Sequence, residues 1–133
     1  MRYLLDTNIV SHFMRQPRGS VGIRIEAVGK EAVFTSVVVA AELRFGVNRS
    51  GSAMLARRLE ETLEALAVVP LEKPADAAYA EIRTYLERQG TPIGSNDLLI
   101  AAHARALGTA LVTANTREFS RVPGLAIEDW TRA

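Results

Sequence analysis

Three acidic residues, Asp6, Glu42 and Asp97, stand at or near the starts of predicted secondary-structure elements. Solvated helix faces account for most of the other acids, such as Glu60 and Glu64. Carboxylates that a fold brings together repel one another and raise each other's pKa. A hard cation removes this repulsion, and Mg²⁺ prefers carboxylate oxygens and often bridges them to a substrate phosphate. The three acids therefore predict a magnesium site.

Glu42 and Asp97 each share a predicted helix face with apolar residues. At helical spacing these neighbours are Val38, Val39, Phe45 and Gly46 for Glu42, and Ile100, Ala101 and Ala104 for Asp97. An unpaired carboxylate on an apolar face loses its hydration at a cost of several kcal/mol. The alternative for Glu42 is a buried ion pair with an arginine. The alternative for Asp97 is a place in the first turn of its helix, which Ser95 or Asn96 would cap.

Asp6 has a simpler alternative explanation. It follows the short apolar run Tyr3–Leu5 in the opening stretch RYLLDTNIV. It could cap the next helix, as could Thr7 or Asn8. Taken alone, that explanation is the stronger one, so Asp6 indicates a site only together with the other two acids.

Asn115, after the predicted strand 110–113, is a fourth candidate ligand. Its side-chain oxygen suits a metal ion or a bound water, and the nearby acid Glu118 could supplement it. A turn or cap role is an equally good interpretation of Asn115. Small polar residues beside the acids could orient the ligands and the water, or simply cap helices. These residues are Thr7, Asn8, Ser95 and Thr113.

Short apolar strands alternate with helices along the chain. Strands are predicted at residues 2–5, 32–36, 68–71, 110–113 and 125–130. Helices are predicted at residues 8–15, 20–27, 37–47, 52–67, 74–89 and 96–107. The helix over 52–67 has the clearest apolar stripe, formed by Met54, Leu55, Leu59, Leu63 and Leu66.

This alternation is typical of an α/β fold with three layers, in which helices cover both faces of a short, mostly parallel sheet of four to five strands. The crossovers between parallel strands are expected to be right-handed. Ligands in such folds bind outside the carboxyl ends of the strands. The acids are therefore expected to meet at that edge.

The composition excludes several classes of protein. The chain has 133 residues, of which 48% are hydrophobic, enough for one domain with a packed core. It has no cysteine, which excludes disulfides, thiolate metal sites and a cysteine nucleophile and fits a cytoplasmic protein. We expect no signal peptide, because the N-terminal apolar run is only Tyr3–Leu5 and an acid follows it. We expect no membrane span, because no apolar run approaches the ~20 residues that a transmembrane helix needs.

The histidines and the net charge carry little functional signal. His12 and His103 lack the spacing of a zinc site. We expect His103 to be partly buried and His12 to lie at the surface. The net charge of +1 argues neither for nor against a nucleic-acid partner.

Four stretches of the chain resemble the PIN-domain ribonucleases, and specifically the VapC toxins of bacterial toxin–antitoxin pairs. They are LLDTNIV (4–10), SVVVAAELRFGV (36–47), GTPIGSNDLLIAAHARALG (90–108) and LVTANTREFSRVPGLAIEDW (111–130). Each motif is weak by itself. All four in this order, over essentially the whole chain, are specific.

By this resemblance, Asp6, Glu42 and Asp97 match the metal-binding acids of the family. Asn115 falls where many members carry a fourth acid, so one metal ion is expected rather than two. The resemblance implies a PIN domain over residues 1–133 with Mg²⁺- or Mn²⁺-dependent endoribonuclease activity. Similar members cleave structured RNA, notably tRNA, and hydrolysis would leave 5′-phosphate and 3′-hydroxyl ends.

The resemblance also implies partners. These are a VapB-type antitoxin, whose C-terminal tail would point a basic residue at the acids, and a second copy of the chain in a homodimer or a larger complex with the antitoxin. The helix over 52–67 is a candidate interface, with core packing as the alternative. Arginines near the acids in sequence are candidates for RNA phosphate contacts, with surface salt bridges as the alternative. They are Arg15, Arg44, Arg49 and Arg117.

The sequence argues against two rival functions and leaves a third one open. An aspartate-nucleophile phosphotransferase would need an acid where Asn8 stands, and a receiver domain would need a lysine after a late strand. The lysines are Lys30 and Lys73, and neither follows such a strand. A PIN-like module that binds RNA or a partner without cutting stays open because of Asn115.

Overall fold

One five-stranded sheet organises the fold in the computed structural model, which describes residues 1–132. The strands are β1 (Tyr3–Leu5), β2 (Val33–Ser36), β3 (Ala67–Val69), β4 (Ala110–Val112) and β5 (Ile127–Glu128). They lie in the order β3-β2-β1-β4-β5, and every neighbouring pair is parallel. The predicted α/β class is confirmed. Ala133, the last residue of the expected domain, lies outside the described residues.

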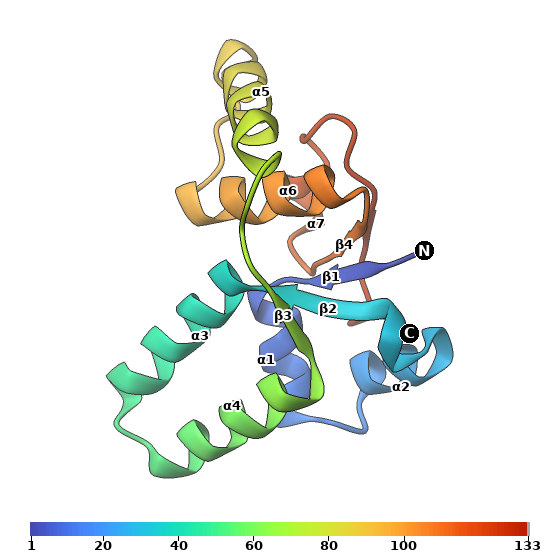
Figure 1. The fold of residues 1–133 in the computed structure, drawn as a ribbon, viewed down its shortest axis with the longest axis vertical. Coiled ribbons are helices and arrows are strands. Elements are labelled where there is room, and N and C mark those ends of the chain that lie inside the picture. The colour runs from blue at the N-terminus through green and yellow to red at the C-terminus, as the bar shows by residue number, and fades with distance from the viewer. Residues whose placement is uncertain (133) are drawn as a thin grey trace.

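Helices cover both faces of this sheet. They are α1 (Thr7–Arg15), α2 (Ser20–Val28), α3 (Val37–Ser50), α4 (Ala53–Ala65), α5 (Ala75–Arg88), α6 (Ser95–Leu107) and α7 (Thr116–Phe119), with the 3-10 turn η1 (Lys30–Ala32). Figure 1 shows α5, α6 and α7 on one side of the sheet and α1, α2 and α4 on the other, which gives the expected three layers. None of the helices in residues 1–132 is long and apolar enough to cross a membrane.

Several element boundaries differ from the sequence prediction. The prediction lacks η1 and α7, because such short helices show no periodicity. Helix α4 ends at Ala65 rather than at 67, and β3 is Ala67–Val69 rather than 68–71. Helix α3 continues to Ser50, where Gly51 ends it with a φ of 68°. The last strand shortens to Ile127–Glu128, because Asp129 turns the chain by accepting the Thr131 backbone N–H at 2.9 Å.

Three helices begin directly after or near the carboxyl ends of strands. Asp6 is the N-cap of α1, and Ser36 is the N-cap of α3. Gly94 is the N-cap of α6, so neither Ser95 nor Asn96 has the capping role that the alternative explanation of Asp97 gave them. The extended backbone of Gly94 lets Ser95 enter the helix as its first residue.

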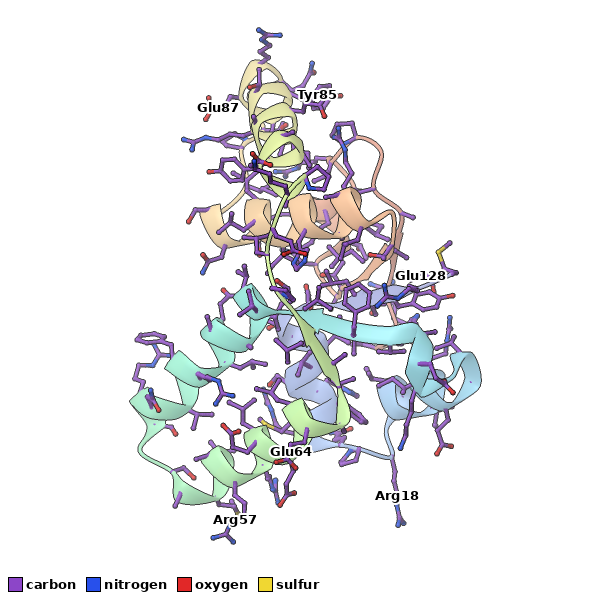
Figure 2. All side chains as sticks on the ribbon, in the orientation of Figure 1. Arg18, Arg57, Glu64, Tyr85, Glu87 and Glu128 are labelled. Carbon is purple, nitrogen blue, oxygen red and sulfur yellow. The ribbon has the colours of Figure 1, made fainter. Side chains whose placement is uncertain are left out.

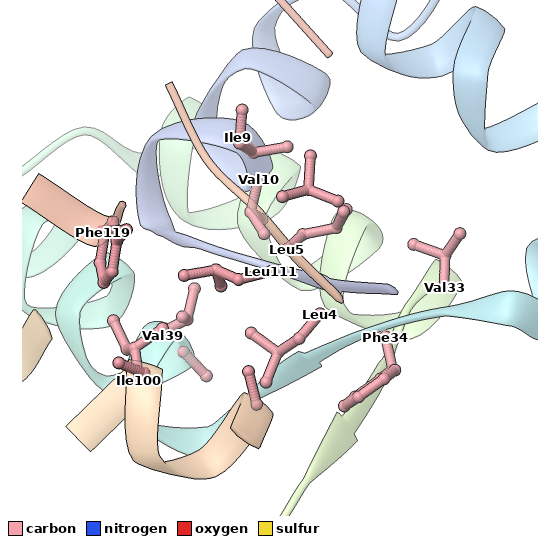
Figure 3. Close-up of a cluster of buried hydrophobic side chains, with 14 of the residues drawn as sticks. Leu4, Leu5, Ile9, Val10, Val33, Phe34, Val39, Ile100, Leu111 and Phe119 are labelled. Carbon is pink, nitrogen blue, oxygen red and sulfur yellow. The ribbon is translucent and has the colours of Figure 1, made fainter. Parts of the chain in front are cut away.

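The side chains of consecutive residues of β1 pack into the core on both faces of the sheet. Leu4 and Leu5 are fully buried and, as neighbours in a strand, point to opposite faces. Figure 3 shows Leu5 with Ile9 and Val10 on one side of the strand, and Leu4 on the side of Ile100.

The apolar stripe of α4 is mainly a core surface. Leu59 and Leu63 are buried, as is Leu66 just after the helix, whereas Met54 is 59% exposed. Figure 2 shows Arg57 and Glu64 of α4 on the outer side of the molecule. Core packing therefore accounts for most of the stripe, and Met54 does not belong to the buried face.

Gly22 and Gly46 give a matched test of helix packing. A Cβ at Gly22 in α2 would lie 1.9 Å from the Pro17 carbonyl oxygen, whereas one at Gly46 in α3 would have no atom within 4 Å. We expect Gly22→Ala to lower the free energy of unfolding by about 1–3 kcal/mol, because backbone must move. Gly46→Ala should raise it by roughly 0.5–1 kcal/mol. Urea unfolding measures both, and equal effects of the two substitutions would contradict the packing described.

Candidate metal centre

The carboxyl ends of β1, β2 and β4 form one edge of the sheet. Strand β1 is central, and the chain places β2 and β3 on one side of it and β4 and β5 on the other. The edge therefore contains the topological switch point, where α/β folds bind ligands. Helices α1, α3 and α6 begin near this edge (Figure 1). The positive ends of their dipoles favour anionic groups there.

Asp6 lies at this edge, directly after β1, with 5% of its surface exposed. Its Oδ1 accepts the backbone N–H of Ile9 at 3.2 Å, so Asp6 is also a helix cap. Burial raises the pKa of Asp6, and the negative charge of Glu42 adds a smaller increase. Hydrogen bonds from the Thr113 side chain and the Ile9 backbone oppose this increase in pKa.

Asp97 lies in the first turn of α6 among other carboxylates. Burial raises the pKa of Asp97 to about 6, together with the charge of Glu118 and a hydrogen bond to it. The charges of Glu42 and Asp6 raise this pKa further. Four acidic side chains, from the N-cap of α1 and from α3, α6 and α7, therefore act on one another at the edge of the sheet.

Glu42 reaches this group from α3 and is half-buried. Its Oε1 accepts the Thr7 hydroxyl at 2.5 Å, and its Oε2 accepts the Asn96 amide at 3.1 Å. Glu42 is therefore held by hydrogen bonds from polar side chains and not by the buried ion pair with an arginine that was the alternative explanation. The helix face is also less buried than expected, because Phe45 is 63% exposed.

Asn115 contacts the acids through Glu118. Its side-chain N–H donates to Glu118 Oε2 at 2.7 Å, and its backbone N–H donates to Thr113 Oγ1 at 2.9 Å. Glu118 in turn lies against Asp97. The single turn of α7 produces this arrangement, because it brings position 118 back over position 115.

The small polar residues singled out from the sequence have different surroundings. Thr7 and Thr113 bond to Glu42 and Asp6 respectively. Asn8 presents its backbone N–H to Asp6, and its side chain is exposed. Ser95 is exposed in the first turn of α6. Its neighbour Asn96 contacts Glu42 instead, a contact that the sequence signalled only by placing Asn96 next to Asp97.

A groove of about 400 Å³ adjoins Glu42 between α1, α3 and α4. Thr7, Asn8 and Arg15 line it, together with apolar residues that include Leu43 and Leu55. Arg15 donates to Ser11 Oγ along the same helix. Arg15 and Glu42 thus line the same groove.

The other candidate arginines lie in different contacts. Arg44 forms an ion pair with Glu60. This is the surface salt bridge that was the alternative to an RNA contact. The Arg49 guanidinium lies 5.3 Å from the centre of the Phe45 ring. Arg117 is exposed on α7, next to Glu118.

The oxygen donors at this edge fit a hard divalent cation in kind. As the side chains stand, no three acidic or histidine residues within 1–132 are arranged to hold one ion. Each carboxylate oxygen of Glu42 accepts one hydrogen bond, from Thr7 or from Asn96, and keeps a second lone pair that a cation could use.

The histidines differ from expectation in their burial. His103 is 2% exposed rather than partly buried, and its Nδ1 lies 2.8 Å from Ser36 Oγ. His12 is half-buried rather than at the surface, with its Nδ1 enclosed. The packing of other elements around α1 and α6 sets how deeply each histidine is buried, and the identity of a single residue in the sequence does not reveal that packing.

Comparisons with known proteins show the family of this chain. The PIN domain profile matches residues 3–125. The chain is 37% identical to Ribonuclease VapC2 of Rickettsia felis over 134 residues, 99% of this chain and 100% of the relative. It is also 37% identical to the tRNA(fMet)-specific endonuclease VapC of Shigella flexneri, over 98% of this chain and 99% of the relative.

A solved structure shares the fold over nearly the same length. VapBC2 of Rickettsia felis bound to a DNA fragment from its promoter matches with a TM-score of 0.89 and 37% identity. The match covers 98% of this chain and 99% of that chain. With this fold, the profile match and the full-length similarity, the chain belongs to the PIN-domain family, among the VapC ribonucleases.

Proposed function

We propose that this chain is the ribonuclease toxin of a toxin–antitoxin pair, an endonuclease that hydrolyses phosphodiester bonds of RNA and is neutralised by a VapB-type antitoxin. One observation carries the proposal: Asp6, Glu42 and Asp97 gather at the carboxyl edge of the sheet. They do so in a chain that resembles named ribonucleases over its whole length.

PIN-domain nucleases generally use a divalent metal ion, and we assign Mg²⁺, with Mn²⁺ as the alternative, to this chain. Asp6, Glu42 and Asp97 would hold the ion, with Glu118 beside Asp97. When bound, such an ion neutralises charge on the scissile phosphate and lowers the pKa of the attacking water. Protein carboxylates and an ordered water shell are the usual environment of Mg²⁺.

The remaining contacts keep these carboxylates in place. Thr7 and Asn96 orient Glu42, and Asn115 orients Glu118. The N-terminus of α1 lies at the same edge, where its backbone dipoles favour a phosphate group. Arg15 on the adjoining groove is our first candidate for a contact to RNA phosphate, because its guanidinium has no carboxylate partner among residues 1–132.

The substrate and partners follow from the relatives. The Shigella relative is named a tRNA(fMet)-specific endonuclease, so we propose tRNA as the RNA class and the cytoplasm as the compartment. The Rickettsia relative was solved as VapBC2, which supports a complex with an antitoxin. In that complex a basic residue of the antitoxin would lie against the acids and compete with the metal ion.

Asp6→Asn separates the enzyme from a non-cutting binding module. Asparagine keeps an oxygen for the Ile9 N–H and remains a good helix cap, so the substitution removes mainly the charge. We expect the wild-type chain, purified free of antitoxin, to cleave RNA in Mg²⁺. The variant should lose more than about 100-fold of the rate, beyond the loss seen when only a partner of a ligand is removed.

The matched control is Glu64→Gln, on the outer side of α4 (Figure 2), which should retain the wild-type rate. If the wild type and Asp6→Asn bind tRNA equally and neither cuts it, the chain is a PIN-like binding module instead.

Metal binding should raise the melting temperature, because the ion binds the folded chain and relieves repulsion between its carboxylates. We expect millimolar Mg²⁺ or Mn²⁺ to give this increase in the wild type and a smaller one in Glu42→Gln. The glutamine keeps an oxygen to accept the Thr7 hydroxyl, which leaves the change in charge as the main difference. Thermal unfolding by circular dichroism across a metal titration measures it, and a melting temperature independent of metal would count against the site.

The metal-free chain should lose stability at Asp97 as pH rises. Folding raises the pKa of Asp97 from 3.8 to about 6, so the folded state binds this proton more tightly than the unfolded state. The contribution is therefore favourable below about pH 4 and is lost as the pH rises through 6. After allowance for solvent screening, we expect a loss of roughly 1–2 kcal/mol.

Asp97→Asn isolates this effect from other titrating groups. Urea unfolding in a chelator at pH 5 and pH 7 should show that the variant gains stability relative to the wild type as pH rises. A difference between the two chains that stays constant over this range would refute the assignment.

A further inference from the structure

A buried hydrogen bond joins the two helices that carry Glu42 and Asp97. His103 on α6 and Ser36 are both buried, and His103 Nδ1 lies 2.8 Å from Ser36 Oγ. Ser36 is also the N-cap of α3, because its Oγ accepts the Val38 backbone N–H at 3.0 Å. The imidazole therefore contacts the residue at which α3 begins.

The available donors and acceptors indicate which of the two atoms donates in this hydrogen bond. Ser36 Oγ already accepts the Val38 N–H, so its own hydroxyl proton needs a buried acceptor. Nδ1 of a neutral imidazole supplies one, and burial favours the neutral ring by lowering the pKa of His103. The ring proton then lies on Nε2. This atom faces the Pro70 carbonyl but has no hydrogen bond of good geometry within residues 1–132.

The bond between His103 and Ser36 lies the same number of residues from each acid along the sequence. Glu42 follows Ser36 by six positions (36 to 42), and Asp97 precedes His103 by six (97 to 103). A second polar contact between α3 and α6, from Asn96 to Glu42, lies at the exposed rim. The buried bond involves neither Glu42 nor Asp97, so it can persist when these acids bind a metal ion.

We propose that His103 is a positioning residue for the acidic site. By accepting the Ser36 hydroxyl proton, it fixes the start of α3 against α6 and so sets the separation of Glu42 and Asp97. This inference rests on the proposed function, in which both acids ligate the same ion. A side chain that only filled the core would need no acceptor at Nδ1, so packing and positioning predict different results.

His103→Asn and His103→Leu form a matched pair of substitutions. Asparagine and leucine have similar shapes, but only asparagine can place an oxygen near the position of Nδ1 and accept the Ser36 proton. Thr109→Val is the control. It removes another buried hydroxyl, which bonds the Ala104 carbonyl near the end of α6 and does not link α6 to α3.

The main measurement is the Mg²⁺ concentration that gives half of the maximal increase in melting temperature. We expect His103→Leu to raise this concentration about 3- to 10-fold, the lower part of the effect of losing a group that orients a metal ligand. His103→Asn should stay close to the wild type. Thr109→Val should melt at a lower temperature with an unchanged half-saturating concentration. The Mg²⁺ dependence of RNA cleavage, measured well below every melting temperature, should follow the same order.

Two results would overturn the proposal. One is equal Mg²⁺ affinity in His103→Leu and the wild type. The other is equal weakening in the leucine and asparagine variants, which would assign the effect to lost ring volume.

A variant that fails to fold does not end the test. The ¹⁵N chemical shifts of His103 in the wild type report its tautomer: a proton on Nε2 supports the donor arrangement, and a proton on Nδ1 overturns it. A wild type that binds Mg²⁺ but leaves RNA intact would refute the proposed function alone, because the thermal shift measures metal binding without cleavage.

Discussion

Repulsion between carboxylates that are partly removed from water is the constraint on which the rest of this structure depends. Asp6, Glu42, Asp97 and Glu118 act on one another at one edge of the sheet, where burial first and then these neighbouring charges raise the pKa of Asp97 to about 6. Asp6 is nearly enclosed, so its charge also loses hydration. Such a group of acids opposes folding when it is ionised, and a hard cation offsets that cost. The clustered acids therefore suit cation binding and lower the stability of the metal-free fold.

The fold holds three of these acids, Asp6, Glu42 and Glu118, by hydrogen bonds from neighbouring donors. The start of α1 supplies the Ile9 N–H to Asp6, and Thr7 of α1 with Asn96 of α6 fixes Glu42. Asn115, just before α7, fixes Glu118. Beneath them, the core packs both faces of β1, so the strand that carries Asp6 to the edge is rigidly enclosed (Figure 3). The geometry of the site thus depends on how α1, α3, α6 and α7 pack.

The strand order explains why the site is open to a large substrate. The chain lays β2 and β3 on one side of β1 and β4 and β5 on the other, so its crossovers diverge above the carboxyl ends of β1 and β4. Helices cover the faces of the sheet (Figure 1), whereas Glu42, Asp97 and Glu118 remain partly exposed at this edge. The groove beside Glu42 extends the edge between α1, α3 and α4 and adds Arg15. An RNA strand, rather than a small enclosed ligand, suits a surface of this kind.

The sequence by itself determined the parallel α/β fold and the edge at which the acids would meet, because strand alternation, helix periodicity and capping are local properties. It also marked Glu42 and Asp97, since a carboxylate on an apolar face is conspicuous in any helix, and it marked Asp6 only together with them. It left open whether Asn115 or Glu118 stands nearer the acids, since the one turn of α7 has no periodic signal. Only the tertiary structure decided that Asn96 meets Glu42 and that His103 meets Ser36. These pairs are separated by 54 and 67 residues, and their contact is set by how distant helices pack.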